Sequence, residues 1–87
     1  MAKYDPLGNY LKDKYSKGID QVLLTFPEIE NIIGVEMEPS ARRYFRSWDN
    51  TGGASYVRQN SWLDVDWETV MVDMENEMVK FAHVMRI

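Results

Sequence analysis

The residues with the greatest chemical potential are acidic: ten of the fourteen Asp and Glu side chains fall in two stretches of the chain. They are Glu28, Glu30, Glu36, Glu38, Asp64, Asp66, Glu68, Asp73, Glu75 and Glu77. Carboxylates on a rigid surface can imitate the spacing of nucleic-acid phosphates and engage a basic groove on a partner. The clustering therefore predicts an acidic protein-binding surface. The alternative is that these charges only keep the folded surface soluble.

A second constellation is basic. Arg42, Arg43 and Arg46 fall on one predicted helix, and Arg58 follows in the next segment. Arginine side chains on such a helix can contact guanine edges or phosphates, which makes nucleic-acid binding the second hypothesis. The alternative is a solvated helix face that pairs with nearby carboxylates, and the formal net charge of -4 favours it.

Residues suited to catalysis or metal binding are scarce. The chain has no cysteine and one histidine, His83, which excludes thiolate nucleophiles and multi-histidine metal centres. Asp64, Asp66 and Glu68 alternate as cation ligands can, but neither a calcium-loop pattern nor a turn glycine surrounds them. Gly52 and Gly53 lack the Lys-Ser/Thr pair of a phosphate-binding loop. We therefore expect no enzymatic activity, metal or cofactor.

These side chains must be positioned by one small domain spanning residues 1–87. The 87 residues are 45% hydrophobic and 13% aromatic, which is enough for one core and near the lower limit for folding on burial alone. The N-terminus has no apolar secretion segment, and no apolar run approaches the ~20 residues needed to cross a bilayer. We therefore expect a cytosolic protein with no membrane association.

Capping signals locate the first two helices. Asp5 as the N-cap, followed by Pro6, predicts a helix over residues 6–16 that ends near Gly18. A second helix, with an apolar stripe, is predicted from the capping-box spacing of Thr25 and Glu28. Its expected stop is the glycine at position 34.

Further helices are predicted in the middle of the chain. Ser40 as the N-cap predicts a helix over residues 41–48. Another short helix over residues 56–65 would carry Trp62 and Leu63 inward. Most aromatic side chains must build the core of so small a protein. Exposed tryptophan and methionine side chains would instead favour a homodimer, which is a third hypothesis.

Short apolar runs predict the strands. Residues 22–24 read as one buried strand, and residues 67–81 read as a β-hairpin with a polar turn at 75–77. In this hairpin Val70, Val72 and Met74 alternate against Val79 and Phe81. The result is an α+β fold of three or four short helices and a small antiparallel sheet ending in the hairpin. The order of elements is similar to that of winged-helix proteins.

Several segments resemble one family of small domains found in bacteria and phages, whose function is unknown. They are Tyr4-Asp5-Pro6-Leu7, residues 24–30 (Leu-Thr-Phe-Pro-Glu-Ile-Glu), Pro39-Ser40-Ala41-Arg42, Trp62-Leu63, residues 72–75 (Val-Asp-Met-Glu) and residues 79–81 (Val-Lys-Phe). The resemblance covers nearly the whole chain and implies one domain with no assigned chemistry.

The chain departs from that family at a few positions. Family members usually carry a Trp-Trp pair at 47–48, where this chain has Ser-Trp, and a glycine where it has Asp66. They also carry histidine and glutamine where it has Tyr56 and Arg58, which implies a changed or lost ligand if the family binds one there. The presence of the family in phages suggests an inhibitor of a nucleic-acid-binding defence protein, similar in role to an anti-CRISPR protein, acting in the bacterial cytoplasm.

Overall fold

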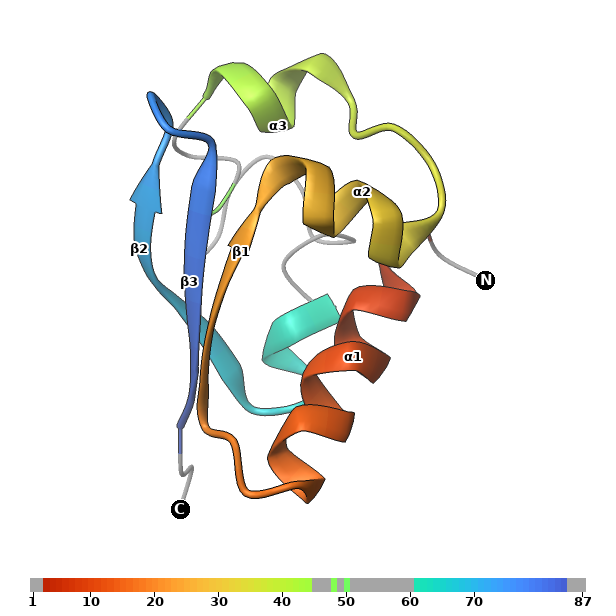
Figure 1. The fold of residues 1–87 in the computed structure, drawn as a ribbon, viewed down its shortest axis with the longest axis vertical. Coiled ribbons are helices and arrows are strands. Elements are labelled where there is room, and N and C mark those ends of the chain that lie inside the picture. The colour runs from red at the N-terminus through yellow and green to blue at the C-terminus, as the bar shows by residue number, and fades with distance from the viewer. Residues whose placement is uncertain (1–2, 45–47, 49, 51–60, 85–87) are drawn as a thin grey trace.

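The computed structural model describes residues 3–44, 48, 50 and 61–84, and its centre is a three-stranded antiparallel sheet (Figure 1). The strands are β1 (Gln21–Thr25), β2 (Trp67–Asp73) and β3 (Met78–His83), and their order in the sheet is β1-β3-β2. β2 and β3 form the C-terminal hairpin. The predicted α+β fold is therefore confirmed.

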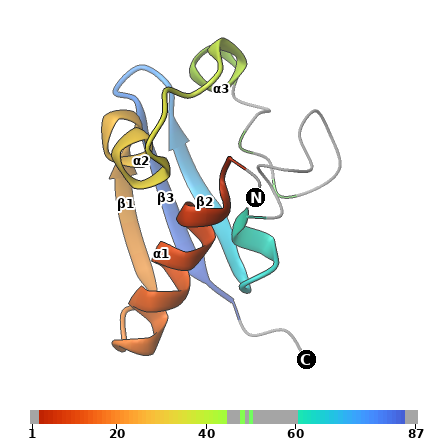
Figure 2. The same cartoon turned by 90° about the vertical axis from the view of Figure 1, so that its right-hand side faces the viewer.

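The helices are α1 (Asp5–Ser16), α2 (Phe26–Ile33) and α3 (Pro39–Arg43), and residues 61–63 form a further helical turn. Helices α1 and α2 cover one face of this sheet, and α3 lies at the end of the sheet near the hairpin turn (Figure 1). Figure 2 shows α1 and α2 on the same side of the strands, with β1 at the outer edge. The order of helix, strand, helix, helix and hairpin agrees with the prediction.

The core between helices and sheet is built on a row of aromatic rings. Phe26 stacks on Trp48 at 5.7 Å between ring centroids, and Trp48 stacks on Trp62 at 5.8 Å. Trp62 then meets Phe81 edge to face at 5.6 Å. All three tryptophans of the chain, including Trp67, are at most 1% exposed. They are core residues and do not serve as the exposed anchors of the homodimer hypothesis.

The first helix begins one residue earlier than predicted. Its N-cap is Tyr4, and Asp5 lies in the first turn, so the assignment of Asp5 as the N-cap was wrong. An acidic residue in the first turn still interacts favourably with the helix dipole. Gly18, at φ +82°, ends the helix as predicted: its N–H bonds to the Tyr15 carbonyl, and the next N–H bonds to the Lys14 carbonyl.

The second helix follows its prediction closely. Thr25 Oγ1 accepts from the Glu28 N–H at 3.2 Å, and Glu28 Oε1 accepts from the Thr25 N–H at 2.9 Å, which completes the capping box. Gly34, at φ +79°, ends the helix in the left-handed conformation. These signals are strictly local, which is why the sequence specifies this element well.

The third helix is shorter than predicted. Its N-cap is Glu38, not Ser40, and the backbone of Tyr44 is extended at φ -117° and ψ 118°. A single helix over 41–48 is therefore wrong. The break lets the buried Trp48 indole N–H donate to the Ala41 carbonyl at 2.9 Å. That carbonyl lies in the last turn of α3 and would otherwise lack an intrahelical partner.

The hairpin contains a β-bulge that the alternating pattern did not predict. Thr69 pairs with Phe81 and Met71 pairs with Lys80, so Val70 is the extra residue. Val70 is consequently 53% exposed, whereas Val72 and Met74 pack against the core, so the predicted alternation is wrong at Val70. Of the predicted helix over 56–65, residues 56–60 lie outside the described part, and residues 61–63 are helical with Trp62 buried.

Candidate functional site

Acidic side chains gather where the hairpin turn meets the start of α2. The Phe26 N–H donates to the Glu77 carbonyl at 2.8 Å, which joins these two segments. We call the four carboxylates that they carry the acidic end: Glu28, Asp73, Glu75 and Glu77. Glu75 is exposed, and Glu28 is exposed while it caps α2. Negative charge from two distant parts of the sequence is therefore presented on one end of the molecule.

The turn that carries these residues is held by its own side chains. Asp73 Oδ1 accepts from the Asn76 N–H at 3.0 Å, and Asp73 Oδ2 accepts from the Asn76 side-chain amide at 2.8 Å. These hydrogen bonds favour the charged form and lower the pKa of Asp73 below its usual value. Glu77 has φ +54°, which reverses the chain into β3. These bonds hold the Asp73 carboxylate within the turn and favour its charged form.

Arg42 ties α3 to both α2 and the hairpin turn. Its Nη2 lies 2.5 Å from Glu30 Oε1, and its Nη1 lies 3.0 Å from Glu77 Oε2. Glu30 also accepts from the Met37 N–H at 2.8 Å. The hydrogen bond from Arg42, together with that from the Met37 backbone, lowers the pKa of Glu30. The hydrogen bond to Glu30 in turn raises the pKa of Arg42. Arg42 is therefore part of an internal ionic cluster.

This arrangement bears on the predicted arginine surface. Of its four members, Arg42 is engaged by Glu30 and Glu77, while Arg43 is exposed. Arg46 and Arg58 lie outside the described residues. The helix on which the prediction rested has only five residues as α3. The described structure therefore brings no group of free arginines together on one helix face.

Five other members of the predicted acidic surface lie away from the acidic end. Glu38 accepts from the Tyr4 hydroxyl at 2.8 Å and from Lys3 Nζ at 3.3 Å. Glu36 is exposed in the loop between α2 and α3. Asp64, Asp66 and Glu68 lie at the opposite end of β2 from Asp73. Glu68 and Asp73 are about 16 Å apart along the strand. The predicted carboxylates thus occupy separate groups instead of one continuous strip.

A shallow cavity of about 390 Å³ opens beside α3, at the end of α2. Its lining is Glu30, Glu36, Met37, Pro39, Arg42 and Arg43. The ionic bond between Glu30 and Arg42 occupies two of the charged groups in this lining. Those charges are thus satisfied within the protein, so they do not favour a ligand of either sign.

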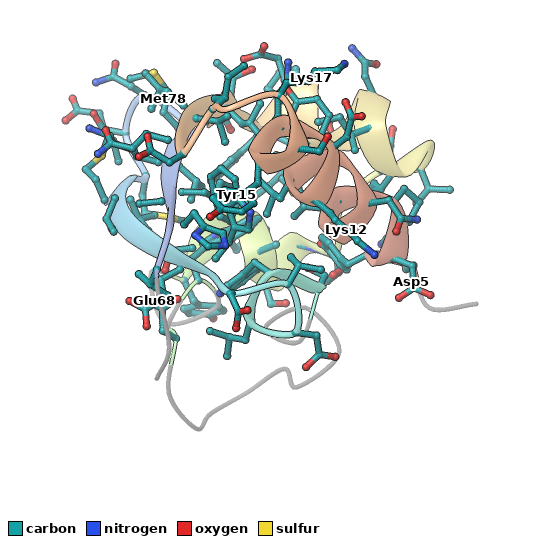
Figure 3. All side chains as sticks on the ribbon, turned by 90° about the horizontal axis from the view of Figure 1, so that it is seen from below. Asp5, Lys12, Tyr15, Lys17, Glu68 and Met78 are labelled. Atoms are coloured by element: carbon teal, nitrogen blue, oxygen red, sulfur yellow. The ribbon has the colours of Figure 1, made fainter. Side chains whose placement is uncertain are left out.

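The lone histidine lies at the other end of the sheet. His83 stacks on Tyr15, with 3.6 Å between ring centroids and 11° between planes, and meets Trp67 edge to face at 5.8 Å. Seen from below, Tyr15 lies near the centre of this end and Glu68 toward its rim (Figure 3). Sequence spacing contains no signal for this contact, because it joins α1 to β3. Within the described ranges, no group of three or more potential metal ligands occurs.

The fold and the polar groups define a small α+β domain with a group of acidic side chains at one end. Residues 4–84 match a family described as a domain of unknown function, DUF7662, and the chain belongs to that family. The resemblance to an uncharacterised domain family is thereby confirmed at that level. No curated protein and no solved structure matches the chain. Among the described residues, no helix is long and apolar enough to cross a membrane.

Proposed function

We propose that this protein is a non-enzymatic binding domain that presents the acidic end to a basic surface of a macromolecular partner. The observation that carries this proposal is that the start of α2, which carries Glu28, meets the 73–77 turn through the bond from Phe26 to Glu77. Arg42, which contacts this group through Glu77, is shared with Glu30. The acidic end therefore keeps a net negative charge.

The rigidity of the acidic end also supports the proposal. Glu28 is held by the capping box, Asp73 by Asn76, and Glu77 by Arg42. Fixed carboxylates lose less conformational entropy on binding than mobile ones, so more of the electrostatic attraction contributes to affinity. Glu75 lies in the turn and is exposed, so it is accessible to a partner.

The most specific form of the proposal is an inhibitor that acts in the bacterial cytoplasm. The acidic end would occupy the nucleic-acid-binding surface of a defence protein, such as a nuclease, because carboxylates compete with phosphates for the same cations. This form also draws on the resemblance to domains of phages and mobile elements. The alternative, nucleic-acid binding through arginines, is weakened because Arg42 is held by two carboxylates.

The test is capture of partners from bacterial lysate by immobilised protein, with two charge-matched variants. Glu75→Lys alters the acidic end, and Asp64→Lys alters an exposed acid at the far end of β2; each changes the net charge from -4 to -2. We expect basic nucleic-acid-handling proteins to be retained by the wild type and by Asp64→Lys. Glu75→Lys should retain them weakly, and added salt should release them.

Two results would overturn the proposal. The first is equal retention by Glu75→Lys and Asp64→Lys, since the acidic end would then contribute nothing particular. The second is a gel shift of DNA or RNA by the purified protein that weakens steeply with salt and disappears in Arg43→Ala. That outcome would favour the nucleic-acid-binding alternative.

A further inference from the structure

The two edges of the sheet are protected very differently. At the β2 edge, the Asn50 side chain accepts from the Thr69 N–H at 2.9 Å and donates to the Thr69 carbonyl at 2.7 Å. The bulge at Val70 further interrupts this edge, and Glu68 and Asp73 add charge. Bulges, charges and covering groups are the usual means of preventing an edge strand from pairing with another chain.

Over residues 21–24 the β1 edge has none of these features. Its sequence, Gln-Val-Leu-Leu-Thr, contains no charge and no proline, and its pairing with β3 is regular over all five residues. Leu23 is 51% exposed, and Ile19, just before the strand, is 39% exposed. Figure 2 shows β1 as the outermost strand of the sheet. An uncharged, regular edge with exposed apolar side chains is suited to pairing.

The ladder between β1 and β3 shows which backbone groups are free. The Phe26 N–H bonds to the Glu77 carbonyl and the His83 N–H bonds to the Asp20 carbonyl, and these bonds lie in register with the ladder. Hydrogen-bonded pairs recur at every second residue of an antiparallel ladder, so the backbone groups of Gln21 and Leu23 point away from β3.

The free edge is short and has a definite end. The Thr25 N–H, which also points outward, is already bonded to Glu28 Oε1 at 2.9 Å. As the N-cap of α2, Thr25 also contributes its carbonyl to the helix. Four groups remain: the N–H and the carbonyl of Gln21 and of Leu23, for which the described residues offer no partner.

We propose that two copies of this chain pair through β1 in an antiparallel, two-fold arrangement centred on Val22. Gln21 of each copy then lies opposite Leu23 of the other, so all four free groups of each strand are bonded. The two sheets become one sheet of six strands. The backbone groups that pair belong to Gln21 and Leu23, whereas Glu28 of the acidic end only bounds this edge at Thr25. The inference therefore does not depend on the proposed function.

The second copy is favoured over a foreign strand because this edge is self-complementary. Both partners are uncharged, so no like charges meet across the two-fold axis. A longer foreign strand would gain no further backbone bond at Thr25, where the capping box ends the ladder. The contact is small, which predicts weak dimerisation at high protein concentration.

Sedimentation velocity from micromolar to millimolar protein tests the proposal. The average mass should rise from 10.2 kDa toward twice that value. Leu23→Pro removes one donor per copy at an edge position where proline is tolerated, so it should weaken dimerisation roughly thirtyfold. Amide exchange should show the N–H groups of Gln21 and Leu23 becoming more protected as the concentration rises.

A matched pair of lysine variants gives a second test that does not depend on proline. Leu23→Lys places charge at the β1 edge, and Val70→Lys places the same charge at a residue of similar exposure, 53% against 51%, at the β2 edge. We expect Leu23→Lys to be monomeric and Val70→Lys to dimerise like the wild type, with circular dichroism confirming that both are folded. A wild type that stays at 10.2 kDa at millimolar concentration overturns the proposal. So does a dimer that Leu23→Pro and Leu23→Lys leave unchanged.

Discussion

Replacing Arg42 by methionine tests the ionic cluster that joins α2, α3 and the hairpin turn. Methionine keeps an apolar chain over the Phe26 ring, which lies 5.8 Å from the guanidinium carbon, but it removes both ionic contacts. Glu77 is 45% exposed and Glu30 is 18% exposed, so solvent screens the Glu77 pair more strongly. An exposed pair contributes about 0.2–1 kcal/mol, and a hydrogen bond to a charged group contributes about 1.5–3 kcal/mol.

We therefore expect Arg42→Met to lower the free energy of unfolding by about 1–2 kcal/mol. For a domain of this size that corresponds to a fall in melting temperature of about 4–8 °C per kcal/mol. Urea denaturation followed by circular dichroism measures the change. Arg43→Met, at the exposed neighbouring residue, is the control and should remain within about 0.5 kcal/mol of the wild type. Equal stability of the two variants would refute the reasoning.

The same cluster predicts a pH dependence. The pKa of Glu30 in the folded protein is below its ordinary value of 4.5, so its contribution to stability is fully present above that pH. That contribution is lost as the pH falls from the unfolded pKa through the lower, folded one. Because the Arg42 hydrogen bond is the main cause of the lowered pKa, Arg42→Met should flatten the loss of stability below pH 4.5. Parallel stability curves for variant and wild type in this range would contradict the assignment.

Two further substitutions test packing. Gly8→Ala should lower the free energy of unfolding by about 1–3 kcal/mol, because the added Cβ would overlap the backbone carbonyl of Ser61. This loss is expected although alanine favours helices. A raised midpoint of urea denaturation would contradict the prediction. Asn50→Ala should cost about 2–4 kcal/mol, because the Thr69 N–H and the Trp62 indole N–H both lose their acceptor. Urea denaturation followed by tryptophan fluorescence measures that loss, and an unchanged midpoint would show that water replaces the amide.

Elements with local signals were the predictable part of the fold. The capping box at Thr25, the glycine stops at positions 18 and 34 and the apolar runs of the strands all act within a few residues. They can therefore be read from spacing alone. The α3 prediction failed because the break at Tyr44 depends on a bond from Trp48 to Ala41, and that bond forms only when the indole is buried in the core.

The candidate site was predictable in composition but not in arrangement. The sequence shows that acidic residues are concentrated in two stretches. It cannot show that the start of α2, which carries Glu28, meets the 73–77 turn while Asp64 lies at the far end of the hairpin. It also cannot show that Arg42 is bound by carboxylates 12 and 35 residues away. Such pairings depend on how the chain is folded back on itself.

The amino-acid sequence by itself determined one small domain, its α+β class, the limits of α2 and the absence of cysteine chemistry. Periodicity and capping are properties of neighbouring residues, and they need no tertiary contact to be recognised. Only the tertiary structure decided which carboxylates share one end of the molecule, which arginine is engaged and which sheet edge is left open. Those outcomes depend on strand register, on the bulge at Val70 and on bonds between residues distant in sequence, and packing selects all of them together.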